Sequence, residues 1–529
     1  PDATKWGPEK WDENYRDTAR INTYETGTAP CKVACPAHIA VQGYLELAKQ
    51  GRFTEALALI KKNNPLPAVC GRICNKVCED YCTRGVLDSP VSIDEVKKFI
   101  AQRDLHADTR YVPPIVQPST RGRFEQKIAI VGAGPAGLSC AFFLAEKGYK
   151  PTIFEKNERA GCMLTYGVPA YKLDREIVQS EIDIIKEMGV EIKTGVEVGK
   201  DITLDELREQ GYQAFYLAIG CQGSRKANIP GEDAEGVYHA VNFLHLINTE
   251  TKPQIHGKMI VVGGGNVAID AARSALRVGA ESSEMFCLEK REEMPASMQE
   301  ILEAEMEDVT INCGWGPKQI IVEDGKVKGV EFKRCISVFD AEGKFSPVYD
   351  VEDTKIVEAD YVCLSIGQAV EWGNLLDGAN VELFRNQFAI ADELTFQTGE
   401  PDIFVGGDVV TGPNFAINAI AAGKEGAVSL HRFVQPKTSL TIGRNKQQYA
   451  MLDKENIEIN SYDQAGRQEP EFKKERLKQL DFVDREGIFT EEQIKIETHR
   501  CLGCGSSVVD VHKCIGCGIC TTKCAFDAI

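Results

Sequence analysis

Apolar residues along the first hundred positions recur with the spacing of helices. Between residues 39 and 62 they return every three or four positions, which predicts an amphipathic helical stretch. The sequence Asn-Pro-Leu-Pro at 64–67 should end it, because proline lacks the backbone N–H that a helix interior needs. We therefore expect a small helical domain over residues 31–105, after an irregular polar arm over residues 1–30.

Two later segments have a different pattern, in which a short apolar run leads into glycines and then into an apolar helix. Residues 127–131 precede the glycine-rich stretch 132–137, and residues 258–262 precede the stretch 263–268. A strand, a glycine turn and a helix in this order are typical of the Rossmann-type dinucleotide-binding fold. The two turns are too far apart to be halves of one such fold, so they predict two domains.

The chain is therefore predicted to be an α/β protein with two Rossmann-like dinucleotide-binding domains, one inserted in the other, between an N-terminal helical domain and a C-terminal module. The predicted boundaries are a first dinucleotide-binding domain at 125–245 and 365–435, a second at 246–364, a charged helical linker at 436–500 and a ferredoxin-like iron–sulfur module at 501–529.

Composition narrows the functional class. The 529 residues carry a formal net charge of −18, which would repel phosphates and argues against nucleic-acid binding. No apolar run in the sequence approaches the about 18–20 residues needed to cross a bilayer. Residues 1–10 lack the apolar core of a signal peptide, so we expect a cytoplasmic protein without membrane association.

Twelve of the 19 cysteines gather near the two ends of the chain. Disulfide frameworks belong to small oxidised domains, so cysteine clusters in a large chain with nucleotide loops favour metal ligation. The last four have the spacing C-x2-C-x2-C-x3-C, which is typical of iron–sulfur clusters, and the two before them form an incomplete partner motif; zinc is the alternative. The candidate ligands are Cys31, Cys35, Cys70, Cys74, Cys78 and Cys82 at one end and Cys501, Cys504, Cys514, Cys517, Cys520 and Cys524 at the other.

The first glycine loop carries the residues that a bound dinucleotide needs. Gly132 permits a tight turn, Gly134 lets the backbone approach a pyrophosphate, and Gly137 lets the helix pack on the strand. The N-terminus of that helix favours phosphate, and Glu155, after the next strand, can accept hydrogen bonds from ribose hydroxyls. The predicted binding residues are Gly132, Gly134, Pro135, Ala136, Gly137 and Glu155.

The second glycine loop should bind a nicotinamide nucleotide. Its discriminating position is Glu289, because a carboxylate there would bond the ribose 2′-hydroxyl and repel a 2′-phosphate. Lys290 and Arg291 would reverse that preference if they turned inward, and a solvated charge run is the other interpretation of this stretch. The predicted binding residues are Gly263, Gly265, Asn266, Val267 and Glu289.

Together these motifs resemble those of the small (β) subunit of glutamate synthase and its relatives, including the large subunit of NADH-dependent ferredoxin:NADP oxidoreductase. The matching sequences are Asn-Pro-Leu-Pro at 64–67, Cys-Gly-Arg-Ile-Cys at 70–74, Met-Leu-Thr-Tyr-Gly-Val-Pro at 163–169 and Met-Pro-Ala at 294–296. The resemblance implies FAD at the first loop, NAD(P)H at the second, and at least two 4Fe–4S clusters.

The resemblance also assigns residues outside the glycine loops. Asp408, which follows a buried strand, is expected to bind the ribityl–phosphate region of FAD, and a helix cap is the alternative interpretation. The helix around Ala416 is expected to aim its N-terminus at the flavin. Met163 and Leu164 would lie near the flavin face, after Cys162, which stands where relatives usually have glycine.

One departure from the family concerns the cysteines. Relatives usually carry a C-x-x-C pair shortly before the position of Cys31, yet residues 1–30 contain no cysteine. One of the two expected N-terminal clusters therefore lacks two ligands. Either it is absent, or the pair at 501 and 504 returns to complete it with Cys31 and Cys82.

A second departure concerns the nucleotide. Relatives often carry an arginine pair that reads the 2′-phosphate where this chain has Leu288 and Glu289, which favours NADH. We expect an oxidoreductase that passes electrons from NADH to ferredoxin or another redox subunit within a hetero-oligomeric complex. Hydride transfer needs no side-chain acid or base, so no catalytic side chain is predicted. The alternatives are a glutamate synthase small subunit and a non-catalytic electron-wiring or flavin-bifurcating subunit.

Overall fold

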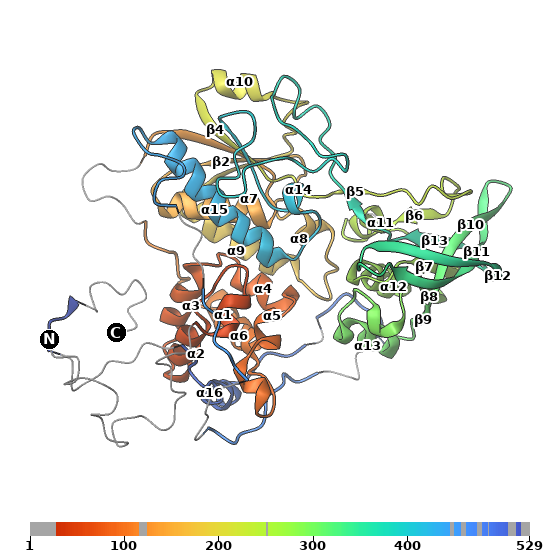
Figure 1. Cartoon of the computed structure of the whole chain (residues 1–529), viewed down its shortest axis with the longest axis horizontal. Coiled ribbons are helices and arrows are strands. Elements are labelled where there is room, and N and C mark those ends of the chain that lie inside the picture. Colours follow the sequence, from red (N-terminus) through yellow and green to blue (C-terminus); the bar gives the residue numbers. More distant parts are fainter. Residues whose placement is uncertain are drawn as a thin grey trace. The chain divides into compact units, whose positions relative to one another are not determined.

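The computed structural model describes residues 28–115, 124–249, 252–444, 449–455, 462–472, 479–484, 486–505 and 515–519 (Figure 1). The chain forms two compact units. Unit 1 contains Pro1–Tyr111, Asn445–Glu471 and Ile488–Ile529, and unit 2 contains Val112–Arg444 and Phe472–Gly487. Residues from both ends of the chain therefore belong to unit 1, and both glycine loops belong to unit 2.

Short helices make up the described part of unit 1. Gly51, at φ +76°, separates the two helices that form within the predicted stretch 39–62, because only glycine adopts this conformation easily. Pro67 starts the next helix, where a missing N–H costs nothing. The helices are α1 (Pro30–Ala34), α2 (Val41–Lys49), α3 (Phe53–Lys61), α4 (Pro67–Ile73), α5 (Val77–Asp80), the 3-10 helix η4 (Thr83–Val86), α6 (Ile93–Leu105) and α16 (Glu491–His499).

Helix α6 is buried against α2, α3 and α4 although it is rich in charge. Lys97 and Lys98 are 4% and 1% exposed, and they form ion pairs with Asp94 and Glu95 one turn earlier. A buried charge is costly unless it is paired. These pairs therefore allow a polar sequence to form the interior of the unit.

The first sheet of unit 2 is parallel, with the strand order β15-β4-β1-β2-β3. Its strands are β1 (Lys127–Val131), β2 (Thr152–Glu155), β3 (Glu191–Thr194), β4 (Tyr212–Leu217) and β15 (Ile403–Val405). Helices α7 (Pro135–Glu146) and α15 (Ala416–Val434) lie side by side on it (Figure 1). They pack closely because Gly423 has no side chain: a Cβ there would lie 2.3 Å from the Ala136 carbonyl oxygen.

The second sheet is also parallel, with the order β6-β13-β7-β8-β9. Its strands are β6 (Val237–His239), β7 (Lys258–Val262), β8 (Ser282–Cys287), β9 (Thr310–Cys313) and β13 (Tyr361–Leu364), with helices α11 (Ala240–Ile247), α12 (Asn266–Arg277) and α13 (Met298–Met306). After β13 the chain returns to the first sheet as β15. The prediction of one Rossmann-like domain inserted in another is therefore confirmed.

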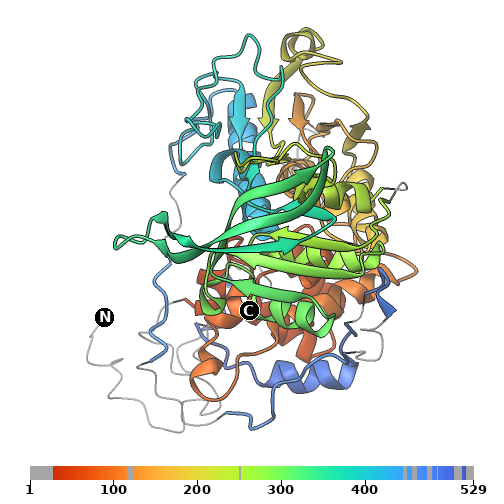
Figure 2. The same ribbon diagram turned by 90° about the vertical axis from the view of Figure 1, so that its right-hand side faces the viewer.

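Three long antiparallel strands follow β9 and were not predicted. They are β10 (Trp315–Glu323), β11 (Lys326–Phe339) and β12 (Phe345–Glu358), paired in that order, and Figure 2 shows them crossing the second domain. Phe332 of β11 stacks on Phe286 of β8, with ring centroids 4.1 Å apart. This contact joins the three-stranded sheet to the core of the parallel sheet.

The remaining short elements connect these sheets. They are α8 (Met163–Tyr166), α9 (Arg175–Glu187), α10 (Leu204–Glu209), α14 (Asp408–Thr411), the 3-10 helix η5 (Arg291–Glu293), and the two-residue strands β5 (Gly223–Ser224) and β14 (Gln368–Ala369), which pair with each other. No helix in the described part of the chain is both long and apolar enough to span a bilayer.

Residues 436–500 differ from the charged helical linker expected there. Their described part contains one helix, α16, and the segment belongs in turn to both units: 445–471 and 488–500 to unit 1, 436–444 and 472–487 to unit 2. The polar composition is misleading because charged residues such as Arg500 are buried among partners. Most of the helix expected around 472–480 lies outside the described residues.

Candidate functional site

The first glycine loop is so tight that two of its glycines are sterically required. Gly132 has φ +103°, and a Cβ on it would lie 2.5 Å from the Ala218 carbonyl oxygen. A Cβ on Gly137 would lie 2.0 Å from the Gly132 carbonyl oxygen. These contacts hold the start of α7, with Pro135 in its first turn, directly against the turn after β1.

Glu155 ends β2 beside this loop and is fixed by the backbone. Its Oε2 accepts a hydrogen bond from the Ala133 N–H at 2.8 Å, and its Oε1 accepts one from the Asn157 N–H at 2.9 Å. Glu155 and Gly132 line a cavity of about 510 Å³ together with Lys156 and Trp372, which the sequence analysis did not single out. The turns that follow parallel strands lie at the same edge of a sheet, and this could have suggested part of the lining.

Residues 162–164 lie next to the same loop. A Cβ on Gly134 would be 3.4 Å from the Cβ of Cys162. Cys162 has φ +51°, a conformation that costs a non-glycine residue free energy, and burial raises the pKa of its thiol to about 12. Cys162 is therefore a neutral thiol at physiological pH. Leu164 is buried at 3% exposure, and Met163 is half-buried.

Asp408 and Ala416 come from the distant end of the same domain. Gly407, at φ +76°, places Asp408 close to α7, since a Cβ on Gly407 would be 3.0 Å from the Ala136 Cβ. Burial raises the pKa of Asp408 to about 6. Ala416 is the first residue of α15. Both residues thus lie in the domain of the first loop.

The second glycine loop is closed by the Met-Pro-Ala motif. Gly263 has φ +148°, and a Cβ on it would lie 2.4 Å from the Ser365 carbonyl oxygen. The Ala296 N–H donates to the Gly264 carbonyl oxygen at 3.1 Å, and the Ser297 N–H donates to Asn266 Oδ1 at 2.9 Å. Ala296, at the end of the motif, and Ser297, directly after it, therefore fix the second loop through their backbone N–H groups.

A cavity of about 560 Å³ lies at the second loop. Gly265, Asn266 and Val267 line it on one side, and Ser365 and Pro413 line it from two segments that the sequence analysis did not single out. Ser365 directly follows β13, so the rule that sites lie at the carboxyl ends of parallel strands could have found it.

Glu289 faces the second loop, and the basic residues after it do not. A Cβ on Gly264 would lie 2.7 Å from Glu289 Oε2, and burial is the main reason that the pKa of Glu289 is raised. Arg291 Nη2 donates to Glu305 Oε2 at 2.8 Å, and the side chain of Lys290 is 71% exposed.

The N-terminal cysteines form two groups in unit 1. In the first, Cys70 and Cys78 lie in α4 and α5, and Cys35 and Cys74 directly follow α1 and α4. Burial raises the pKa values of Cys70, Cys74 and Cys78, and the nearby charge of Lys97 opposes that shift in each case. A buried cation beside several thiols suits an anionic cluster.

The second group combines both ends of the chain. Cys31 and Cys82 line a pocket of about 340 Å³ together with Cys501 and Cys504. Burial and then the neighbouring thiols, that of Cys82 first, raise the pKa of Cys31. Among the described residues, no three His, Cys, Asp or Glu side chains converge on one point where a single metal ion would bind. Cys517 is exposed, and Cys514, Cys520 and Cys524 lie outside the described residues.

Comparison with known proteins decides the family. Residues 126–423, more than half of the chain, match the model of the pyridine nucleotide-disulphide oxidoreductases. The chain belongs to this family. Residues 15–109 match the model described as dihydropyrimidine dehydrogenase domain II, 4Fe-4S cluster. The chain is therefore an FAD- and iron–sulfur-dependent oxidoreductase subunit.

Curated relatives agree with this assignment. The chain is 36% identical over 503 residues to the NADP(+)-dependent formate dehydrogenase subunit beta of Moorella thermoacetica, covering 90% of this chain and 70% of that one. It is 35% identical over 433 residues to the glutamate synthase [NADPH] small chain of Escherichia coli, covering 77% and 89%. It is 34% identical to the NADPH-Fe(3+) oxidoreductase subunit beta of Geobacter sulfurreducens and spans 64% of its length. The resemblance to the glutamate synthase small-subunit group is thus confirmed.

Solved structures support the fold. FprA from Mycobacterium tuberculosis in complex with NADPH matches 59% of this chain and 85% of its own chain, with a TM-score of 0.51 and 20% sequence identity. At this identity the likeness shows the fold alone.

Proposed function

We propose that the chain passes electrons between NADH and ferredoxin or a partner redox subunit through FAD and at least two 4Fe–4S clusters. The observation that carries this proposal is that one chain contains both nucleotide-type loops and grouped cysteines, in separate units. Unit 2 holds two dinucleotide-type loops, each beside a cavity, and among the described residues of unit 1 two groups of four cysteines lie close together. A flavin supplies the chemistry that links hydride transfer to single-electron transfer.

The protein's own residues would hold FAD at the first loop. The Gly132–Gly137 turn leaves the backbone open to a pyrophosphate, and the cavity lined by Glu155 suits an adenosine. Asp408, close to α7, would accept hydrogen bonds from hydroxyls further along the cofactor. The 19-residue helix α15 begins in the same domain and carries no acidic residue in its first turn, which keeps its N-terminus favourable to negative charge.

The second loop would bind the exchangeable nucleotide, and we propose NADH. Relatives are named for NADPH or NADP(+), whereas in this chain a carboxylate, Glu289, faces the loop at the position that reads the ribose. A carboxylate repels a 2′-phosphate. Arg291 is paired with Glu305 and would have to leave that pair to bind a phosphate.

The partner is proposed to be another subunit of a redox complex. Three relatives are named as subunits or chains of larger enzymes. The match to the formate dehydrogenase subunit beta covers 90% of this chain, compared with 77% for the glutamate synthase small chain, which favours an electron-transfer complex. A cytoplasmic location is part of this proposal.

A second candidate is a glutamate synthase small subunit, because the chain spans 89% of that relative. The two candidates differ in their acceptor. Glutamine-dependent glutamate formation on addition of a synthase large subunit would support this second candidate. Reduction of ferredoxin by NADH without glutamine supports the first.

The deciding experiment is anaerobic purification of the full chain, followed by counts of flavin, iron and sulfide and by stepwise addition of NADH. We expect about one FAD and at least about eight iron atoms per chain, with flavin bleaching first and cluster signals appearing afterwards. A protein that retains iron but no flavin would be a non-catalytic electron-wiring subunit, and the proposal would fall.

A further inference from the structure

We propose that Cys31, Cys82, Cys501 and Cys504 bind one 4Fe–4S cluster, so that the two ends of the chain complete a single metal site. This inference goes beyond the proposed function, which requires clusters but does not say which cysteines share one. It also explains how the chain compensates for the C-x-x-C pair that residues 1–30 lack.

The pocket itself fits such a group. Its lining includes the four cysteines, and most of its other residues are apolar, such as Val41, Leu45 and Ile93. Thr83 also lines it, at 1% exposure, and its side chain forms a hydrogen bond with that of Cys504. A hydroxyl in this position can donate to a thiolate ligand of a cluster, and hydrogen bonds to the sulfurs are common around such clusters.

The chemistry favours a cluster over a single ion. In a cubane each thiolate binds a different iron atom, so its four sulfurs surround a space instead of meeting at one point. No three metal-ligating side chains among the described residues meet at a single point, which speaks against a structural zinc site. The described cysteines are also free rather than joined as disulfides.

The backbone around Cys501 and Cys504 has the form that a C-x-x-C ligand pair needs. Gly503, between them, has φ +63°, and Gly505 has φ +64°, which turns the chain back on itself. Leu502 is 7% exposed and lines the pocket. Gln42 of α2 donates through Nε2 to the Cys504 carbonyl oxygen at 2.7 Å, which fixes the turn to the N-terminal helices.

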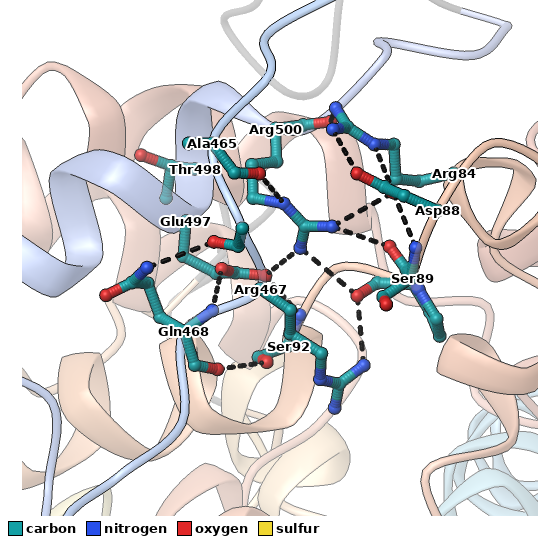
Figure 3. A network of polar contacts seen from close by, with 12 residues as sticks. Arg84, Asp88, Ser89, Ser92, Ala465, Arg467, Gln468, Glu497, Thr498 and Arg500 are labelled. Atoms are coloured by element: carbon teal, nitrogen blue, oxygen red, sulfur yellow. Dashed lines mark hydrogen bonds and ion pairs between the residues drawn. The ribbon is translucent and has the colours of Figure 1, made fainter.

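Arg500 anchors the segment immediately before Cys501. Its side chain is 0% exposed and donates to Ala465 O at 2.9 Å, Ser89 O at 2.7 Å and Asp88 Oδ1 at 3.1 Å. Arg84, which is almost as deeply buried, donates to the carbonyl oxygen of Arg500 at 3.1 Å (Figure 3). Buried guanidinium groups are tolerated only when their donors are satisfied.

Glu497 completes the network one turn earlier on α16. Its Oε1 accepts from the Ser92 N–H at 2.7 Å and from Arg500 Nη1 at 2.7 Å, and its Oε2 accepts from the Gln468 N–H at 2.7 Å (Figure 3). Removing one partner from such a network leaves a buried charge without compensation and is strongly destabilising. Cys501 and Cys504 are therefore held in place by a buried network of hydrogen bonds and ion pairs, as cluster ligands must be.

The test uses the full chain, purified anaerobically, with two double variants, Cys501→Ser with Cys504→Ser and Cys31→Ser with Cys82→Ser, and the quadruple variant. Each double variant is expected to lose about four iron atoms per chain and the same low-temperature EPR signal. The quadruple variant should lose no more than either double. Cys363→Ala, at a buried cysteine in β13, is the matched control and should keep all iron.

Different lost signals for the two double variants, a summed loss in the quadruple variant, or no iron loss would each overturn the proposal. A flavin count checks that unit 2 stays folded, so loss of flavin and loss of one cluster are distinguishable. Should a variant fail to fold, alkylation of the unmodified holoprotein gives the answer. All four cysteines should become reactive together when iron is removed, and separate reactivity of the two pairs would contradict a shared cluster.

Discussion

The two glycine loops of unit 2 begin alike and differ in how tightly they are built. In the first, a Cβ on Gly137 would meet the Gly132 carbonyl oxygen at 2.0 Å. In the second, the corresponding residue is already Ala268, which is 0% exposed. Glu155 accepts from two backbone N–H groups, whereas Glu289 is partly exposed and faces Gly264.

This difference suits two kinds of ligand. A closely packed loop with a fixed acidic residue is pre-organised, which favours a tightly held cofactor. A looser loop suits a nucleotide that must leave after each turnover. A contact outside the first loop also keeps it tight. Helix α15 packs on α7 at Gly423, so α7 cannot move away from the loop.

The largest expected effect is that of Gly137→Ala, which should break the first loop. The added methyl would overlap a backbone carbonyl, and overpacking of this kind costs about 1–3 kcal/mol or more. We expect loss of nearly all bound flavin and a lower melting temperature, measured as the FAD-to-protein ratio and by thermal unfolding. Ala268→Gly is the matched change in the second loop and should cost about 1 kcal/mol. Full flavin content in Gly137→Ala would contradict the comparison.

Glu289→Arg should reverse the nucleotide preference at the second loop. Replacing a carboxylate with a guanidinium removes repulsion and adds a phosphate donor, so kcat/KM for NADPH relative to NADH should rise at least about tenfold, equivalent to about 1.4 kcal/mol. Steady-state kinetics with both nucleotides gives the ratio. Glu293→Arg makes the same charge change nearby on η5 and should alter the ratio little. An unchanged ratio would remove Glu289 from nucleotide selection.

Asp408→Asn should stabilise the flavin-free protein in a pH-dependent way. Burial raises the pKa of Asp408 to about 6, so in the folded state the carboxyl prefers to be neutral. Its contribution to stability is fully present below about pH 4 and is lost as pH rises through about 6. The variant should therefore be more stable by about 1–2 kcal/mol above pH 6 and equal to the parent below pH 4.

Thermal unfolding of the flavin-free protein across this range measures the difference, and Glu289→Gln provides the comparison at the second loop. The pKa of Glu289 is also raised, chiefly by burial, so this variant should show the same sign. An Asp408→Asn profile parallel to that of the parent would mean that the carboxyl is not buried in solution.

The smallest effect is expected for Arg291→Ala. Arg291 is bound to Glu305 at the surface, and such pairs contribute about 0.2–1 kcal/mol. Both nucleotides should therefore bind within about twofold of the parent values, as measured by flavin reduction at varied concentration. A marked rise in KM for NADPH alone would show that Arg291 leaves Glu305 to bind the 2′-phosphate.

Local signals explain what the sequence could predict. The strands 127–131 and 258–262 are short apolar runs, each followed by glycines in a turn that other residues could not form. Both features are visible in the sequence without knowledge of the tertiary structure. The antiparallel strands β10–β12 were missed because much of their surface is exposed, so their sequences lack a clear apolar pattern. They also pair only with one another, and such pairing leaves no mark on the sequence of a single strand. Likewise, nothing local shows that β15 returns beside β4.

The cysteine sites show the same limit more sharply. Spacing alone groups Cys501 and Cys504 with the cysteines that follow them. Their position beside Cys31 and Cys82 depends on the buried contacts of Arg500, which no periodicity reveals. From the sequence, this arrangement is one of two alternatives. The number of missing ligands follows from the sequence, whereas the path of the chain between residues 82 and 501 does not.

The buried contact between Arg84 and the Arg500 carbonyl oxygen joins residues 416 positions apart. At about 5–20 residues per second on the ribosome, the later partner emerges roughly 20 to 80 s after the earlier one. Nearly all residues of unit 2 have left the ribosome before Arg500 does. Newly made N-terminal helices must therefore wait, with Arg84 and the Ser92 amide lacking their final partners, until translation is almost finished.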